Sequence, residues 1–267
     1  MNNISKKSLI EIKNILLPIA INACKLIMNN KDSNIEIKKD GTPVTIADKA
    51  ADNIIHKSLK KHFSNIPILS EERKIPIGCY GNNLHWIIDP LDGTKSFIEG
   101  GQDFSTCISL VKNKSPILGC IGHPPSLNCW IGGKKIGTYK KKHNTIKNIY
   151  CREIPFKGPT IAISRHHIGP KLKTWLSNIN YFETKEIGSA LKFSLLAEGK
   201  ADIFPRTSPT FEWDSAAGQA IVEGAGGTVM QMNSNQMIYG RKDKKNPNFI
   251  AFGKENWSDY LKEKNID

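Results

Sequence analysis

One apolar run that ends in two carboxylates constrains this chain more than any other feature of its sequence. Trp86-Ile87-Ile88 leads into Asp89-Pro90-Leu91-Asp92, and the chain then turns at Gly93. The apolar residues predict a buried strand, and the two acids stand where that strand meets the turn. Carboxylate oxygens are the ligands that Mg²⁺ requires, and backbone amides after the glycine can hold a phosphate beside the metal. The motif therefore predicts a metal site next to a phosphate site.

The size and composition are those of an ordinary globular protein. The chain has 267 residues, of which 39% are hydrophobic and 24% charged, enough for one large domain or two moderate ones. Residues 9–28 predict an amphipathic helix rather than a signal peptide, because charged residues interrupt them. No apolar run reaches the ~18 residues of a membrane span. We therefore expect a protein without an integral membrane segment.

The six cysteines indicate a reducing compartment. None belongs to a CxxC pair, and most have apolar neighbours in the sequence. Reduced, buried thiols are therefore expected in place of a disulfide framework or a zinc site. We expect a cytoplasmic protein.

The net charge of +13 comes almost wholly from lysine. It reflects either a compositional bias or an attraction for a polyanionic substrate, nucleic acid or an anionic membrane. The clearest basic run, residues 134–142, contains one aromatic residue, Tyr139, so it resembles a solvated loop more than a nucleic-acid patch. We expect no nucleic-acid partner, and peripheral attachment to the inner face of the cell membrane stays open.

Periodicity divides the chain into two halves near residue 155. Residues 1–155 predict an α+β half, with helices over 9–28 and 46–63 and an antiparallel meander of strands over 66–69, 85–89, 104–111, 117–122 and 127–132. Pro18 should kink the first helix. Residues 134–157 predict a hairpin and then the crossing between the halves. Residues 156–267 predict an α/β half, with strands over 160–164, 201–204, 227–231 and 249–252 and helices over 189–198, 214–226 and 257–264.

Three other acidic segments accompany the strand-end motif. They are Asp40-Gly41-Thr42-Pro43-Val44-Thr45-Ile46-Ala47-Asp48, Ile68-Leu69-Ser70-Glu71-Glu72 and Phe211-Glu212-Trp213-Asp214-Ser215-Ala216-Ala217-Gly218. Each has an ordinary structural explanation, such as a helix cap for Asp48 or Asp214 and a charged strand end for Glu71. The four segments in this order are hard to obtain by chance. Together they predict metal-dependent hydrolysis of a phosphate ester.

The order and residues of these segments resemble the lithium-sensitive, Mg²⁺-dependent phosphatase superfamily, over about residues 10–255. That superfamily includes inositol monophosphatases, fructose bisphosphatases and bisphosphate nucleotidases. The resemblance implies an αβαβα layered sandwich with two or three Mg²⁺ ions in a cleft between its halves. The metal ligands that it implies are Glu71, Asp89, the backbone carbonyl of Leu91, Asp92 and Asp214. Glu72 matches a second, less critical acid.

The same resemblance makes Asp48 and Thr94 the candidate catalytic residues. Asp48 matches an acid that pairs with Thr94 near the attacking water. Clustered cations lower the pKa of water and neutralise a phosphate dianion, and the sequence has no phosphocysteine or phosphohistidine motif. We therefore expect direct in-line attack by a metal-activated water. The amides of Gly93 and Thr94 should cradle the phosphate, since Gly93 permits a close backbone approach.

The second half contains residues suited to a second phosphate. Ser189 and Lys192 stand three apart, so they should share the first turn of a helix capped by Ser189. Arg206 can add a forked contact. The alternative explanation is a capped helix with a solvated lysine and a loop arginine.

With Asp-Pro-Leu-Asp-Gly-Thr-Lys at residues 89–95, these segments resemble the bacterial 3′(2′),5′-bisphosphate nucleotidase branch. Its members convert adenosine 3′,5′-bisphosphate to AMP and phosphate, and so remove a product of sulfur metabolism. Ser164-Arg165-His166-His167 resembles the branch's Ser-Arg-Ser-His and implies that His167 lies near the nucleotide. The chain departs from the branch at His166, at Ser96, where glutamate is usual, and at Thr207-Ser208.

Three functions are weighed against each other. The leading one is a nucleotidase whose partner is a small bisphosphorylated nucleotide. An inositol monophosphatase would need no second phosphate site, so Ser189, Lys192 and Arg206 favour the nucleotidase. A nucleic-acid or ribosome-associated protein that retains the phosphatase fold is motivated by the net charge, but the complete acid set favours catalysis. We expect a monomer or a homodimer.

Overall fold

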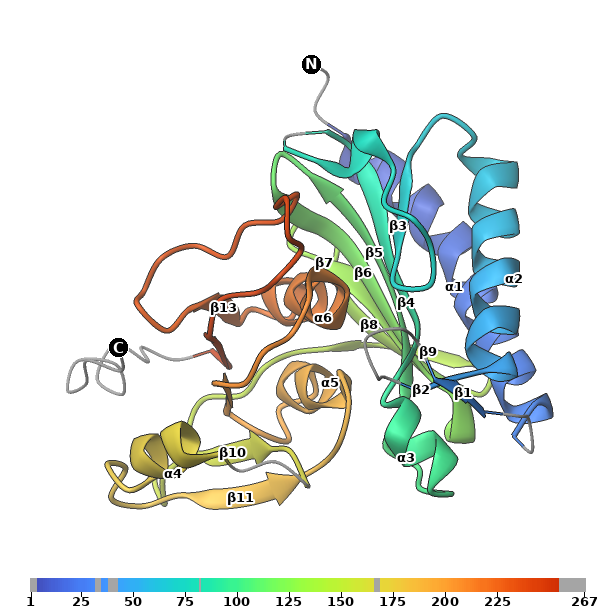
Figure 1. Cartoon of the computed structure of the whole chain (residues 1–267). Coiled ribbons are helices and arrows are strands. Elements are labelled where there is room, and N and C mark those ends of the chain that lie inside the picture. Colours follow the sequence, from blue (N-terminus) through green and yellow to red (C-terminus); the bar gives the residue numbers. More distant parts are fainter. Residues whose placement is uncertain (1–3, 32–34, 38–42, 82, 166–168, 255–267) are drawn as a thin grey trace.

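Helices and sheets alternate through the molecule in five layers (Figure 1). The computed structural model describes residues 4–254 apart from 32–34, 38–42, 82 and 166–168. The outermost layer is formed by α1 (Lys6–Asn29) and α2 (Ile46–His62). Helix α1 continues through Pro18 without interruption, and α2 matches the predicted helix over residues 46–63 closely.

The second layer is a seven-stranded sheet in the order β3-β4-β5-β6-β7-β8-β9. Its strands are β3 (Ile68–Ser70), β4 (His85–Asp92), β5 (Ser105–Lys112), β6 (Ser115–His123), β7 (Asn128–Gly133), β8 (Gly137–Lys142) and β9 (Thr145–Ile149). Strand β3 runs parallel to β4, and all other neighbours are antiparallel. The predicted antiparallel meander is therefore confirmed from β4 to β7, and so is the hairpin over residues 134–157. The prediction was wrong for the strand at residues 66–69, because β3 pairs with β4 in parallel.

Strand β4 is buried from His85 to Leu91 because both of its faces are covered. Trp86 and Ile88 belong to the core beneath α1 and α2, whereas Ile87 belongs to the core between the two sheets. Alternate residues of a strand point to opposite faces, and a sheet with helices on both faces needs apolar residues at every position. This burial holds the strand that carries Asp89 and Asp92.

The third layer, between the sheets, consists of α5 (Leu191–Ala197) and α6 (Glu212–Gly224). The fourth is a five-stranded sheet in the order β11-β10-β12-β14-β13. Its strands are β10 (Thr160–Ile163), β11 (Glu183–Glu186), β12 (Ile203–Arg206), β13 (Thr228–Gln231) and β14 (Phe249–Phe252). The fifth layer is α4 (Pro170–Leu176), whose Leu172 and Trp175 pack on this sheet. The αβαβα sandwich is therefore confirmed.

The remaining short elements were not predicted from the sequence. Strands β1 (Ile35–Ile37) and β2 (Pro43–Thr45) form a separate antiparallel pair. Helix α3 (Thr94–Ile98) follows directly after Gly93, and the short 3₁₀ helices are η1 (Ile77–Cys79) and η2 (Pro124–Ser126). Strand β11 and helix α4 were also missed. The helix predicted over residues 257–264 lies outside the described residues.

Two predicted helix starts were wrong. Helix α5 begins at Leu191, two residues after Ser189, so Ser189 is not its N-cap. Helix α6 begins at Glu212, so Asp214 occupies its third position, with Phe211 as the N-cap residue. Asp214 accepts the Phe211 N–H there, as an acid at the third position of a capping box does.

Membrane-spanning segments are not found in the described part of the chain, where every helix is too short or too polar to cross a bilayer. The six cysteines are all buried free thiols, as predicted.

Candidate metal and phosphate site

Carboxylates from two distant segments converge near the end of β4. Asp89, Asp92 and Asp214 each offer one oxygen, and these three oxygens all lie within 4.8 Å of one another. Asp89 and Asp92 come from β4 and Asp214 from the first turn of α6. The structure thus brings together three of the predicted ligands. Two of them, Asp92 and Asp214, are 122 positions apart in the chain.

A β-bulge explains how two acids three residues apart reach the same pocket. In a regular strand, residues i and i+3 point to opposite faces. Here Asp89 pairs with Cys107 and Asp92 pairs with Ser105, so three steps along β4 match two along β5. The extra residue turns Asp92 to the side on which Asp89 lies. The Pro90 carbonyl at this irregular position accepts the Thr106 hydroxyl at 2.9 Å.

Backbone amides orient each of the three carboxylates. Leu91 donates its N–H to Asp89 Oδ1 at 3.1 Å, and Phe211 donates its N–H to Asp214 Oδ2 at 2.7 Å. Ala190 donates its N–H to Asp92 Oδ2, and the Ser105 hydroxyl donates to the same oxygen at 3.4 Å. The carboxylates are therefore held in place before any cation arrives.

The electrostatics of the cluster call for a cation. Burial raises the pKa of Asp89 well above its ordinary value, and the charges of Glu71, Asp92, Asp214 and Asp48 raise it further. Burial, followed by the charge of Asp92, raises the pKa of Asp214 to about 8. Buried acids that repel one another are stabilised as anions by a divalent ion. The donor set of carboxylate oxygens fits Mg²⁺, so these residues suit the metal that the sequence implies.

Glu71 and the Leu91 carbonyl also lie at this site. The charge of Glu71 raises the pKa of both Asp89 and Asp214, and its N–H donates to the carbonyl of Ile88, the residue before Asp89, at 3.3 Å. The Leu91 carbonyl accepts the Thr94 hydroxyl at 3.0 Å.

The predicted Asp48–Thr94 pair is present. The Thr94 hydroxyl lies 3.3 Å from Asp48 Oδ1. The other oxygen of Asp48 accepts the N–H and the hydroxyl of Thr45, at 2.7 and 2.6 Å. Asp48 is therefore both the capping acid of α2 and a partner of Thr94.

Gly93 occupies a position that only glycine fits. Its φ is +91°, and a Cβ there would lie 2.7 Å from the Asp103 carbonyl oxygen. The residue is the N-cap of α3, so the turn delivers Thr94 into the first turn of that helix. The tight turn therefore needs glycine for its backbone conformation and for space.

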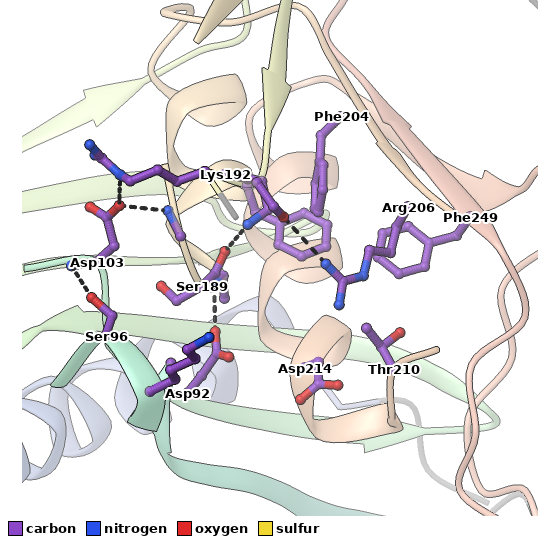
Figure 2. A pocket seen from close by; sticks show the side chains of 17 residues that line it. Asp92, Ser96, Asp103, Ser189, Lys192, Phe204, Arg206, Thr210, Asp214 and Phe249 are labelled. Atoms are coloured by element: carbon purple, nitrogen blue, oxygen red, sulfur yellow. Dashed lines mark hydrogen bonds and ion pairs between the residues drawn. The ribbon is translucent and has the colours of Figure 1, made fainter. Parts of the chain in front are cut away.

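A cavity of 240 Å³ extends from the acids into the second half of the molecule (Figure 2). In this view Asp92 and Asp214 lie below Lys192 and Arg206. The lining residues include Asp92, Gly93, Ser96, Asp103, Ser189, Lys192, Arg206 and Asp214.

A buried lysine and a half-buried arginine line this cavity. Lys192 donates from Nζ to the carbonyls of Ser189 and Ile187, at 2.8 and 3.2 Å, and burial lowers its pKa to about 8. Arg206 reaches the Ser164 hydroxyl at 3.4 Å, and its buried Nε has no hydrogen-bond partner among the described residues. Explaining Lys192 as a solvated lysine was wrong. A guanidinium that lines a cavity and makes one long hydrogen bond suits an anionic ligand.

Ser189 reaches the cavity by a different route from the one predicted. It adopts a left-handed backbone conformation, with φ of +53°. Its hydroxyl donates to Ser105 Oγ at 3.2 Å and accepts the Leu191 N–H at 3.3 Å. The expected shared helical turn with Lys192 is replaced by the Lys192 bond to the Ser189 carbonyl.

The departures from the nucleotidase pattern lie around the cavity. Ser96 accepts the Asp103 N–H at 3.2 Å. Thr207 and Ser208 line a neighbouring cavity of 460 Å³, to which Arg206 also contributes. His166 and His167 lie outside the described residues.

Asp103 was not predicted from the sequence. This residue precedes β5, and its Oδ2 accepts from Arg165 Nε and from the Gly188 N–H, both at 3.0 Å. It therefore joins the two halves beside the cavity. No recognisable motif surrounds Asp103. The one sequence feature that could have indicated it is its position just before β5, the strand that pairs with β4.

The fold and the acid cluster together define a class of protein. Residues 8–262 match the inositol monophosphatase family, and the chain belongs to that family. Two curated relatives bear the name 3′(2′),5′-bisphosphate nucleotidase CysQ. The one from Buchnera aphidicola is 38% identical over 241 residues, covering 90% of each chain. The one from Escherichia coli K12 is 36% identical over 239 residues, covering 86% of this chain and 95% of the relative.

Solved structures agree with this assignment. The crystal structure of CysQ from Bacteroides thetaiotaomicron has a TM-score of 0.76 and 30% identity, covering 91% of this chain and 98% of that one. An inositol monophosphatase from Thermotoga maritima has a TM-score of 0.77 at 23% identity, covering 93% and 94%. At that identity the second likeness concerns the fold alone.

Proposed function

We propose that this protein hydrolyses the 3′-phosphate of adenosine 3′,5′-bisphosphate, giving AMP and phosphate, and that the reaction requires Mg²⁺. The observation that carries the proposal is one cavity with anionic and cationic ends. Asp92 and Asp214 line it together with the cations Lys192 and Arg206. A substrate with two separated phosphates matches these two ends. The names of relatives at 31–38% identity support the same substrate.

The acid end holds the metal. Two or three Mg²⁺ ions would be held by Glu71, Asp89, the Leu91 carbonyl, Asp92 and Asp214. When bound, these ions neutralise the phosphoryl oxygens, lower the pKa of water and stabilise the leaving oxygen. The acid cluster and its raised pKa values support this assignment.

The chain's own residues orient the reactants. Asp48 is fixed by Thr45 and accepts the Thr94 hydroxyl, so the lone pairs of Thr94 Oγ1 are directed to accept a hydrogen from the attacking water. The amides at Gly93 and Thr94 face the phosphate at the beginning of α3, where backbone N–H groups lack helical partners. No protein nucleophile takes part, and the water attacks opposite the leaving 3′-oxygen.

The cationic end binds the 5′-phosphate. Arg206 offers its guanidinium, and Lys192 supplies charge from beneath the loop that contains Ser189. A substrate without a 5′-phosphate would leave these cations without a counter-ion. The site therefore favours a bisphosphate over a monophosphate. The proposed substrate, adenosine 3′,5′-bisphosphate, is what remains of a nucleotide sulfate donor once its sulfate has been transferred. The enzyme would therefore act on the product of a sulfate-transfer reaction. Six buried free thiols support a reducing compartment such as the cytoplasm.

A phosphate-release screen tests the proposal. The purified protein would be assayed with Mg²⁺ on adenosine 3′,5′-bisphosphate, adenosine 3′-monophosphate, inositol 1-phosphate and fructose 1,6-bisphosphate. We expect the highest kcat/KM for adenosine 3′,5′-bisphosphate. A higher kcat/KM for inositol 1-phosphate would instead make the protein an inositol monophosphatase. No turnover of any ester, combined with salt-sensitive RNA binding, would favour the nucleic-acid alternative.

A further inference from the structure

The turn that carries Glu71 is tied on both sides to one carboxylate of α2. The Ser70 hydroxyl donates to Asp52 Oδ1 at 2.6 Å, and Arg73 Nε donates to Asp52 Oδ2 at 2.5 Å. Asp52 is 3% exposed and Ser70 is 1% exposed. Charge-assisted hydrogen bonds inside a protein are the strong ones. Ser70, immediately before Glu71, and Arg73, two residues after it, are therefore both fixed to Asp52.

The backbone of this turn is closed around Glu71. Ser70 accepts the Glu72 N–H on its hydroxyl at 3.2 Å and the Arg73 N–H on its carbonyl at 3.3 Å. The Glu71 N–H donates to the Ile88 carbonyl of β4, the residue before Asp89. A shift of Ser70 or Arg73 would therefore carry the Glu71 side chain with it.

Helix α2 serves two parts of the site. Asp48 lies one helical turn before Asp52, so both acids lie on the same face of the helix. Asp48 reaches Thr94, and Asp52 reaches the Glu71 turn. Arg73 completes the contact by donating from its NH2 group to Asn53 Oδ1 at 2.7 Å. The guanidinium is thereby held against two successive residues of α2.

We propose that Asp52, together with Arg73, is a positioning residue that sets Glu71 for the divalent cation. The inference rests on the proposed function, because it takes Glu71 as a metal ligand. Groups that orient a metal ligand typically change metal affinity 10- to 100-fold when they are removed. Asp52 acts through Ser70 and Arg73 and does not itself contact the substrate.

Direct metal binding tests the proposal without turnover. Calorimetric titration of the metal-free protein with Mn²⁺, and then Mg²⁺, would be compared for the native chain and Asp52→Ala. We expect the variant to bind about tenfold more weakly. In the Glu71→Gln background the same substitution should have no further effect on affinity, because the ligand that it positions is gone. Equal affinities of Asp52→Ala and the native chain would overturn the proposal.

Asp202→Asn is the matched control. Asp202 is also a buried aspartate paired with an arginine: it accepts from Arg152 through two bonds of 2.9 Å and from the Thr160 N–H. It lies in the second half and does not line the cavity. We expect this variant to lower the melting temperature and leave the metal affinity unchanged. A loss of affinity equal to that of Asp52→Ala would assign both effects to general destabilisation and overturn the proposal.

Arg73→Met separates positioning from simple electrostatics. Arg73 is a positive charge near a cation site, so a purely Coulombic role predicts tighter metal binding once it is removed. Positioning predicts weaker binding, by about two- to fivefold, because Ser70 alone still holds Asp52. Arg73→Lys should recover part of the affinity. Tighter binding by Arg73→Met would contradict the proposal, and this variant serves even where Asp52→Ala fails to fold.

Turnover supplies a second readout. At saturating Mg²⁺ we expect the kcat and the nucleotide KM of Asp52→Ala to lie near those of the native chain, while the Mg²⁺ concentration for half-maximal activity rises about tenfold. A nucleotide KM that rises at saturating Mg²⁺, with no change in metal affinity, would refute the positioning role. A native chain that binds Mn²⁺ and Mg²⁺ but releases no phosphate would refute the proposed function alone. A native chain that binds neither metal would refute both.

Discussion

Thr94 and Asp48 lie 46 positions apart in the chain, and their contact joins the first turns of α3 and α2. The Thr94 hydroxyl is 3.3 Å from Asp48 Oδ1 and 3.0 Å from the Leu91 carbonyl oxygen. A hydroxyl has one proton, so it donates to one of these acceptors at a time and offers its lone pairs elsewhere. Because Asp48 is fixed by Thr45, the orientation of Thr94 follows from the cap of α2.

Thr94→Val removes this hydroxyl while keeping the β-branched shape. We expect kcat for adenosine 3′,5′-bisphosphate to fall about 100-fold with little change in KM, since general acid–base contacts contribute about 10²–10⁴. Thr94→Ser restores the hydroxyl and should recover most of the rate. Steady-state kinetics at saturating Mg²⁺ measures both. A valine variant with native kcat would remove Thr94 from the mechanism.

Asp92→Asn tests the metal end of the site. Asparagine retains a carbonyl oxygen that can accept the Ala190 N–H, so the contact between the halves survives. The lost negative charge weakens the hold on Mg²⁺. We expect turnover to fall at least about 1000-fold while circular dichroism stays native. Native turnover in this variant would show that Asp92 is not a ligand.

The acids of the site could be predicted from the sequence, but the bulge that unites two of them could not. Trp86 to Ile88 forms a continuous apolar run that predicts a buried strand, and β4 is that strand. Its last residues break the two-residue period through pairing with β5, which is a tertiary property. A regular strand would have placed Asp89 and Asp92 on opposite faces.

For the cationic end of the cavity, the lining residues were predicted correctly, but the local backbone structure was not. Lys192 and Arg206 do line the cavity, yet Ser189 precedes α5 instead of capping it. Its left-handed backbone is stabilised by contacts with Ser105, which is 84 residues away. Local propensity carries no information on such a contact. Asp103 was missed for the same reason, because its partners Arg165 and Gly188 come from the other half.

The metal-free protein should lose stability as the pH rises. The pKa of Asp214 is raised to about 8 in the folded protein, against about 3.9 for an unfolded aspartate. Between these values the folded state binds more protons than the unfolded state, so the free energy of unfolding falls with increasing pH. Thermal melts in a chelator from pH 5 to pH 8 should show a falling melting temperature.

Asp214→Asn isolates this effect. The variant has no charge to bury, so we expect a higher melting temperature than the native chain at pH 8 without metal, and a flatter pH dependence. Added Mg²⁺ should stabilise the native chain and leave the variant almost unchanged. A native metal-free protein whose melting temperature rises from pH 5 to pH 8 would contradict the assignment of these acids.

Arg206→Met tests how the cavity recognises a second phosphate. Within the described part of the chain, the Arg206 side chain makes one hydrogen bond, to Ser164, whereas Lys192 holds the carbonyls of residues 187 and 189. Arg206 is therefore the cleaner probe. We expect KM for adenosine 3′,5′-bisphosphate to rise about 10- to 100-fold, the effect of one lost charge-assisted contact to a phosphate. Adenosine 3′-monophosphate lacks the 5′-phosphate, so its kcat/KM should stay within about twofold of the native value. Equal losses on both substrates would mean that Arg206 supports the reacting phosphate, and the 5′-phosphate would then need a different partner in the cavity.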